Sequence, residues 1–158
     1  MQKINNSTGE ENLLAKVAEA KTASLELASI PSETKNRALM RAAESILSKS
    51  EALIAANKKD LDAAKTLLEQ GKLSRSLVAR LKLDDSKLDE ISRMVKSVAT
   101  LEDPVGKVVY SIKMDENLDL FKLTVPFGVV AAVFEARPDA LPQIAALCVK
   151  SGNAVILK

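Results

Sequence analysis

Histidine is the most informative absence in this chain. None of the 158 residues is histidine, which excludes Ser-His-Asp and Cys-His nucleophile arrangements within the chain, together with the zinc sites that use imidazole. Cys148 is the single cysteine, so no internal disulfide can form, and a lone thiol is typical of a reducing cytoplasm. One cysteine and scattered carboxylates provide no metal-ligand pattern, so we expect no metal site.

Aromatic residues and long apolar runs are also scarce. Aromatics make up 3% of the chain, and 23 basic and 21 acidic residues are interleaved along it. Neither an aromatic platform nor a basic stripe therefore favours a nucleic-acid partner. Glu135, Arg137 and Asp139 interrupt the most hydrophobic region, which falls short of the run of about 18 apolar residues typical of a membrane span. Residues 1–12 lack the apolar core of a signal peptide, so we expect a cytoplasmic, globular protein.

Apolar residues at three- and four-residue spacing predict helices over residues 10–99. We expect the first helix to end before Pro31. The second should begin with Ser32 as its N-cap and break at Asn57, and Gly71 should stop the helix that follows. The apolar stripes predict helix faces that pack in a core rather than a groove for a partner. The remaining helix boundaries are expected at Ser74, Leu81, and Asp84 or Asp85.

After Pro104 the pattern changes to that of extended strands. Residues 105–114 and 118–125 flank a turn-rich connection at residues 115–117, which predicts a β-hairpin over 105–125. The second arm mixes apolar and polar side chains on both faces, so we expect a face that is incompletely buried. Another domain, or a second copy of the chain in a homo-oligomer, could cover this face.

Residues 129–158 predict one parallel strand–helix–strand unit. The run 129–134 is apolar on both faces, as in a strand buried between two layers. A helix should start near residues 137–139 and end at Gly152, which suits a left-handed C-terminal position, and residues 154–157 should form a second strand. Because two parallel strands do not complete a sheet, the pattern indicates an α/β fold and the front part of a larger protein.

Six segments, taken in order, resemble one known family. They are AANKKD at 55–60, RLKL at 80–83, LEDPVG at 101–106, VPFGVV at 125–130, FEARPD at 134–139 and KSGNA at 150–154. Together they are similar to the gamma-glutamyl phosphate reductase family, also called glutamate-5-semialdehyde dehydrogenase, of the aldehyde dehydrogenase superfamily. The resemblance implies that residues 1–158 form the N-terminal part of an aldehyde dehydrogenase-like, dinucleotide-binding domain, truncated before its catalytic domain.

The resemblance also implies an activity. Members of the family are oxidoreductases that use NADPH to reduce gamma-glutamyl phosphate to glutamate-5-semialdehyde and phosphate in proline biosynthesis. Their nucleophilic cysteine lies far beyond the segment that matches KSGNA, so no catalytic residue is expected in this chain. Cys148 falls on the apolar face of the predicted crossover helix, and we interpret it as structural. The segment alone should therefore be inactive.

Two positions are candidates for binding. Lys158 matches the superfamily lysine that approaches the adenosine ribose of the cofactor, and it follows a parallel strand, where α/β sheets bind ligands. Arg137 falls where most aldehyde dehydrogenases carry an oxyanion-binding asparagine, and its guanidinium could hold the acyl phosphate of the substrate. A salt bridge from Arg137 to Glu135 or Asp139 is the structural alternative. Apart from such a salt bridge, we expect Glu135 to make a structural hydrogen bond. Asp139 is not expected to take the role of the asparagine, because an ionised carboxylate has no hydrogen-bond donor.

Other functions stay open at this point. The chain could be a non-catalytic, truncated α/β fragment or a helical interaction module. It could also belong to a dehydrogenase of another aldehyde, although FEARPD at 134–139 stands in place of the Pro-Trp-Asn turn of those enzymes. A reading frame that continued past Lys158 into a glycine-rich βα segment and then a cysteine would favour the reductase.

Overall fold

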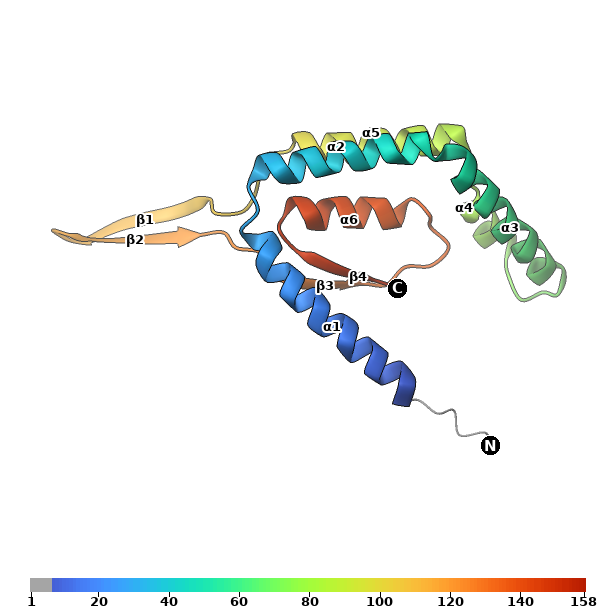
Figure 1. Ribbon diagram of the computed structural model, residues 1–158, viewed down its shortest axis with the longest axis horizontal. Helices are drawn as coiled ribbons and strands as arrows, with labels where there is room; N and C mark the ends of the chain where they lie inside the picture. Colours follow the sequence, from blue (N-terminus) through green and yellow to red (C-terminus); the bar gives the residue numbers. More distant parts are fainter. Residues whose placement is uncertain (1–6) are drawn as a thin grey trace.

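The computed structural model describes residues 7–158, which form six helices and two small sheets (Figure 1). Residues 1–6 lie outside the described residues. They belong to residues 1–12, the segment in which no signal peptide is expected. None of the helices in the described part is long and apolar enough to cross a membrane. The elements are α1 (Ser7–Ala28), α2 (Ser32–Ser48), α3 (Ser50–Glu69), α4 (Arg75–Leu81), α5 (Asp85–Thr100), β1 (Val108–Asp115), β2 (Leu118–Leu123), β3 (Val129–Ala132), α6 (Ala140–Lys150) and β4 (Ala154–Leu157).

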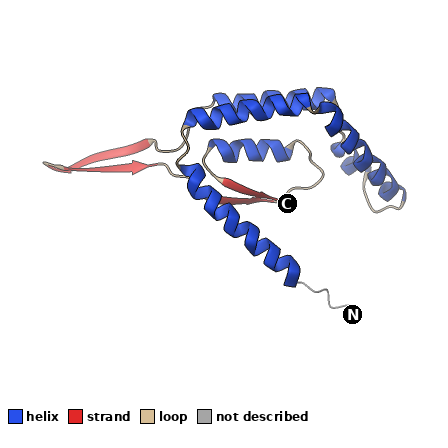
Figure 2. Ribbon diagram, viewed as in Figure 1, coloured by secondary structure: helices blue, strands red, loops and turns tan. Residues whose placement is uncertain are grey.

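The core lies where α2, α5 and α6 meet. Helices α2 and α5 run side by side, and α6 lies between this pair and the strands β3 and β4 (Figure 2). The Ser92 hydroxyl is fully buried in this core and donates to the Ala43 carbonyl, 3.0 Å away. Its hydrogen bond joins α5 to α2, and it leaves no unsatisfied polar group between them. The core side chains are Leu39, Ala43, Val95, Val98, Ala99 and Ala146.

The helix break predicted at Asn57 is wrong. Helix α3 runs through this residue, and the break comes earlier, at Lys49 between α2 and α3. Asn57 is buried because its amide donates to the Leu81 carbonyl and accepts from the Leu83 amide, both at 2.8 Å. These tertiary hydrogen bonds hold the loop after α4 and outweigh the poor helix propensity of asparagine. Ser32 is likewise the first residue of α2 and not its N-cap, a position that Pro31 occupies.

Other predicted boundaries are confirmed by their caps. The Ser74 hydroxyl accepts from the Leu77 amide at the start of α4, and the Asp84 carboxylate accepts from the Lys87 amide at the start of α5. Hydrogen bonds from the Lys82 ammonium and from the Lys87 amide lower the pKa of Asp84, so the cap is ionised at neutral pH. Gly71 follows α3 with a φ of 70°, the left-handed conformation that suits glycine.

The first helix differs from the expected core-packed face. Leu13, Leu14 and Leu25 on α1 are each more than half exposed. Helix α1 contacts the two-stranded sheet of β3 and β4 only over part of its length and projects beyond it (Figure 1). A sheet of two short strands is too small to cover a helix of 22 residues.

The predicted hairpin is present, but neither of its faces is buried. Strands β1 and β2 pair antiparallel, and every residue of both strands is exposed. The hairpin projects away from the helices, so its base alone meets the rest of the chain (Figure 1). At this base the Gly106 amide donates to the Thr124 carbonyl, and the Thr124 amide donates to the Lys107 carbonyl. The expectation of one partly buried face is therefore corrected to two exposed faces.

Strands β3 and β4 pair in parallel through the crossover helix α6, as predicted. The expected strand over 129–134 is shorter, because β3 ends at Ala132. Gly152 ends α6 with a φ of 71° and donates to the Val149 carbonyl, while Asn153 donates to the Cys148 carbonyl, the bonds of a Schellman motif.

The apolar positions of α6 are only partly buried. Leu141 and Leu147 are exposed, whereas Ala146 and Cys148 are buried. Because the sheet has two strands, it covers one strip of the helix and leaves the flanks uncovered.

Candidate functional site

The ends of β3 and β4 lie side by side at the carboxyl edge of the sheet. The Lys158 amide donates to the Ala132 carbonyl at 3.0 Å, and the Lys158 carbonyl accepts from the Phe134 amide at 2.9 Å. The parallel ladder therefore extends one residue past β4, to Lys158. Arg137 follows in the loop between β3 and α6, so Arg137 and Lys158 both come after strand ends at this edge. Lys158 is exposed there, which is where α/β sheets bind ligands.

Arg137 pairs with Asp139 and not with Glu135. Its Nη2 lies 3.3 Å from Asp139 Oδ2, and Lys87 Nζ lies 3.9 Å from the same oxygen. Glu135 makes no ion pair within residues 7–158 and is exposed. The Arg137 side chain remains 56% exposed, so it is accessible to a ligand even with its Asp139 partner. An exposed ion pair of this kind contributes little to stability.

A charged hollow of about 610 Å³ opens beside Arg137. The loop after β3 forms one side, and the end of α4 together with the start of α5 forms the other. Sequence reasoning identified Arg137 and missed the remaining cations, because single charged residues on exposed helices resemble ordinary solvated surface. The charged lining residues are Arg80, Lys82, Asp84, Lys87, Arg137 and Asp139.

An apolar groove of about 420 Å³ lies next to the charged hollow. Leu81, the last residue of α4, and Leu83, in the loop after it, contribute to one wall, and Phe134 and Leu141 contribute to the other. Arg137 lines both spaces. It therefore lies between an apolar surface and a cluster of charges, the arrangement expected around a polar ligand with a short hydrocarbon chain.

The glycine and asparagine of KSGNA have structural roles. Asn153 is buried, and its Oδ1 accepts from the Gly128 amide at 2.9 Å, which fixes the loop before β3 against the loop before β4. A Cβ atom on Gly152 would lie 2.9 Å from the Pro126 side chain, so glycine is needed for close approach as well as for its positive φ. These residues position the two strands and do not reach the carboxyl edge.

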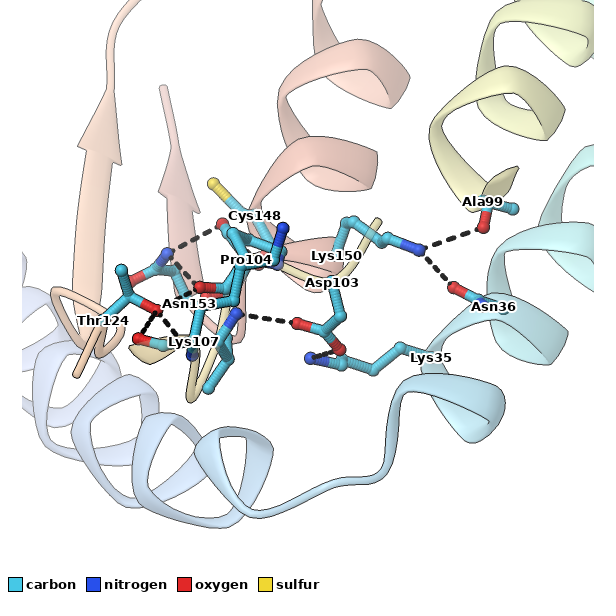
Figure 3. A network of polar contacts seen from close by, with 12 residues as sticks. Lys35, Asn36, Ala99, Asp103, Pro104, Lys107, Thr124, Cys148, Lys150 and Asn153 are labelled. Carbon is cyan, nitrogen blue, oxygen red and sulfur yellow. Dashed lines mark hydrogen bonds and ion pairs between the residues drawn. The ribbon is translucent and has the colours of Figure 1, made fainter. Parts of the chain in front are cut away.

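Two lysines that sequence reasoning missed are almost fully buried. Lys150 is 3% exposed, and its Nζ donates to Asn36 Oδ1 at 2.6 Å and to the Ala99 carbonyl at 3.0 Å (Figure 3). Lys35 is 2% exposed and pairs with Asp103 at 2.5 Å (Figure 3). Both lysines tie α2 to segments far away in the sequence, and neither lines the charged hollow. Their positions indicate roles in folding.

The Asp103 pair predicts a loss of stability in acid. Burial acts to raise the pKa of Asp103, but hydrogen bonds from the Lys35 ammonium and the Val105 amide outweigh it and hold the pKa below its ordinary value of 3.8. A lowered folded-state pKa stabilises the protein above the ordinary value, and this contribution is lost as the pH falls through the folded-state pKa. We expect Asp103→Asn to lower the free energy of unfolding by about 1–3 kcal/mol at pH 7.

Urea denaturation from pH 7 to pH 3 measures this effect. The difference between the wild type and Asp103→Asn should be largest at neutral pH and should shrink with acidification. Asp62→Asn, which removes an exposed carboxylate paired with Lys65, is the matched control and should change little. If the stability difference between the wild type and Asp103→Asn did not depend on pH, Asp103 would not have the lowered pKa that we attribute to its pairing with Lys35.

Cys148 lies inside the crossover helix, away from the charged hollow. Cys148 is 8% exposed, and burial raises the pKa of its thiol. A buried thiol with a raised pKa is a poor nucleophile at neutral pH. Within residues 7–158, no three or more acidic, cysteine or histidine side chains are placed together to hold a metal ion.

By its fold the chain is an α/β protein whose candidate binding residues lie at the carboxyl edge of two parallel strands. Its curated relatives are reductases, and more particularly gamma-glutamyl phosphate reductases. The chain is 51% identical over 148 residues to the one from Natronomonas pharaonis and 45% identical over 148 residues to the one from Methanosarcina acetivorans. Each match covers 94% of the chain, which spans about a third of the length of these relatives (34% and 33%).

Solved structures give the same result. The gamma-glutamyl phosphate reductase of Thermotoga maritima matches 92% of this chain with a TM-score of 0.84 and 31% identity. That of Saccharomyces cerevisiae matches 88% with a TM-score of 0.82 and 38% identity. The chain again corresponds to 34% of each structure. No protein-family model matches it. The chain is thus homologous to gamma-glutamyl phosphate reductase over nearly all of its own length, as its sequence motifs predicted.

Proposed function

We propose that this chain is the amino-terminal portion of an NADPH-dependent reductase that converts gamma-glutamyl phosphate to glutamate-5-semialdehyde and phosphate in the cytoplasm, as a step of proline biosynthesis. The observation that carries the proposal is the match to gamma-glutamyl phosphate reductase along 94% of the chain at 51% identity. The match to about a third of each relative supports the view that other segments of the enzyme supply the rest of the site. The reacting thiolate would come from one of these segments.

Arg137 is the residue of this chain that we assign to the substrate. In the reaction a cysteine thiolate attacks the acyl carbon, the carbon–oxygen bond to phosphate breaks, and the resulting thioester is reduced to the aldehyde. A guanidinium beside the acyl group would bind the phosphate oxygens and stabilise the negative charge that develops during attack. The exposure of Arg137 and its place between the apolar groove and the charged hollow support this role. Its pairing with Asp139 would hold the guanidinium in position.

Lys158 is the residue that we assign to the cofactor. NADPH, when bound, supplies the hydride that reduces the thioester. An exposed ammonium at the carboxyl end of β4 suits the ribose hydroxyls or phosphates of a dinucleotide. Helix α6 and the strands β3 and β4 would then be one unit of a dinucleotide-binding domain, with its further strands contributed by the rest of the enzyme.

The hairpin of β1 and β2 supports a homo-oligomer. Its exposed side chains include Ile112 and Leu120, which pair across one face of the arm, and Phe121, which lies on the other face. We propose that residues 105–125 pair with a second copy of the enzyme, because an arm exposed on both faces needs a covering layer.

The alternative to an enzyme is a non-catalytic fragment, and one experiment separates the two. We expect the complete product of the reading frame that contains this chain to reduce NADP⁺ in the reverse direction, when glutamate-5-semialdehyde and phosphate are both present. We expect residues 1–158 alone to show no such activity, because the single cysteine, Cys148, is buried and its thiol has a raised pKa. No activity in the complete product would refute the proposed function.

Cys148→Ala in the complete product is the matched control for the nucleophile. The buried Cys148 thiol should be dispensable, so the variant should keep its turnover. Cys148→Ser could lower stability instead, because a buried hydroxyl needs a hydrogen-bond partner. Loss of turnover in Cys148→Ala without loss of stability would show that Cys148 is the nucleophile and that our assignment is wrong.

A further inference from the structure

The charged hollow beside Arg137 carries both signs of charge. Four cations line it, namely Arg80, Lys82, Lys87 and Arg137, together with two carboxylates, Asp84 and Asp139. A site for phosphate alone has no use for carboxylates, because they repel the ligand. A site for an α-amino acid needs both signs, since its carboxylate pairs with a cation and its ammonium pairs with an anion.

The pairing within the hollow leaves one cation available. Lys82 pairs with Asp84 at 3.0 Å, and both Lys87 and Arg137 approach Asp139. Arg80, in the last turn of α4, makes no ion pair within residues 7–158 and is exposed. Its planar guanidinium can bind a carboxylate through two parallel hydrogen bonds.

We propose that this hollow binds the α-amino and α-carboxylate groups of the substrate, with Arg80 receiving the carboxylate. The ammonium would face the carboxylate of Asp84, in place of or beside its present partner Lys82, while Asp84 continues to cap α5. The inference rests on the proposed function and names the part of its site that selects an amino-acid substrate. The substrate has a reacting acyl phosphate at one end and an amino-acid group at the other. Arg137 lines the hollow at the end assigned to the acyl phosphate, and Arg80 lines it from α4.

Charge and location support this assignment over a cofactor phosphate. The four cations and two carboxylates of the lining sum to a net charge of +2, and gamma-glutamyl phosphate carries about −2 at neutral pH because its ammonium offsets its α-carboxylate. Lys158, the residue assigned to the cofactor, does not line the hollow. The apolar groove that shares Arg137 with the hollow provides a surface for the methylene groups between the two ends.

The test uses the complete enzyme in the reverse direction, where the Michaelis constants for semialdehyde, phosphate and NADP⁺ can be measured separately. Arg80→Gln should raise the constant for glutamate-5-semialdehyde roughly 10- to 100-fold, the usual effect of losing a hydrogen bond to a charged group. The constants for phosphate and NADP⁺ should not change. Arg75→Gln is the matched control, because Arg75 is also exposed on α4 but does not line the hollow.

A second substrate separates recognition from damage to the fold. With butanal, which lacks the α-amino and α-carboxylate groups, Arg80→Gln and the wild type should react equally well. A change in the constant for phosphate or NADP⁺, or no change in the constant for the semialdehyde, would overturn the inference. A wild-type enzyme without reductase activity would refute the proposed function instead.

If the wild-type enzyme has no reductase activity, binding of L-glutamate still tests the inference. L-Glutamate carries the same amino-acid group, and titration calorimetry measures its binding without turnover. The wild type should bind it, and Arg80→Gln should bind it at least tenfold more weakly. Equal binding by the two proteins, or no binding by the wild type, would overturn the inference.

Discussion

Replacing Arg137 by lysine is expected to slow the complete reductase roughly a hundredfold, a loss of about 3 kcal/mol of transition-state stabilisation. The charge survives the substitution, but an ammonium is a point charge and does not reproduce the planar, paired contact of a guanidinium with phosphate oxygens. The loss should therefore appear in catalysis and in the dependence on phosphate. Binding of NADPH should change little, because Arg137 is assigned to the substrate.

Steady-state kinetics in both directions measure this effect. The forward reaction uses gamma-glutamyl phosphate, and the reverse reaction reports the phosphate dependence directly. Arg93→Lys is the matched control, because Arg93 is an exposed arginine paired with a carboxylate, Asp89 at 3.7 Å, and lines neither the hollow nor the groove. If Arg137→Lys kept its rate and its phosphate dependence, Arg137 would be a structural ion-pair residue.

Replacing Lys150 by methionine is expected to lower the free energy of unfolding by about 2–4 kcal/mol, because two partners of the ammonium lose their donor. One of them, the Ala99 carbonyl, lies in the last turn of α5, where helix carbonyls have no partner within the helix. The Lys150 ammonium therefore caps α5 from another helix and also binds Asn36 of α2. Methionine retains most of the apolar stem, so the measured loss reports on the ammonium.

Urea denaturation of Lys150→Met measures this loss. Lys65→Met is the matched control, since Lys65 is 63% exposed and pairs with Asp62 on the surface of α3, and its change should stay within about 0.5 kcal/mol. Equal stability of Lys150→Met and the wild type would show that the buried hydrogen bonds contribute nothing net.

Local sequence was sufficient for the features that depend on near neighbours in the chain. Helical spacing predicted the crossover helix with Cys148 on its inner side, and turn chemistry predicted Gly71 and Gly152 at helix ends. The apolar runs around α6 predicted a parallel pair, and from that pair the shared edge of Arg137 and Lys158. These predictions hold because side-chain periodicity, left-handed glycines and parallel connectivity are decided within a few turns of the chain.

Only the tertiary structure decided which polar residues are buried and which charges meet. Asn57 stays inside α3 because of a loop more than twenty residues away, and Lys150 is buried because α2 and α5 supply its acceptors. Arg80 reaches the hollow of Arg137 only because α4 and the loop after β3 pack near each other. A charged residue has the same local sequence signal whether it faces water, a helix end or a ligand, since its partners come from distant segments. Sequence by itself thus determined the α/β elements and the sheet edge where we propose that ligands bind, and packing determined the side chains assembled there.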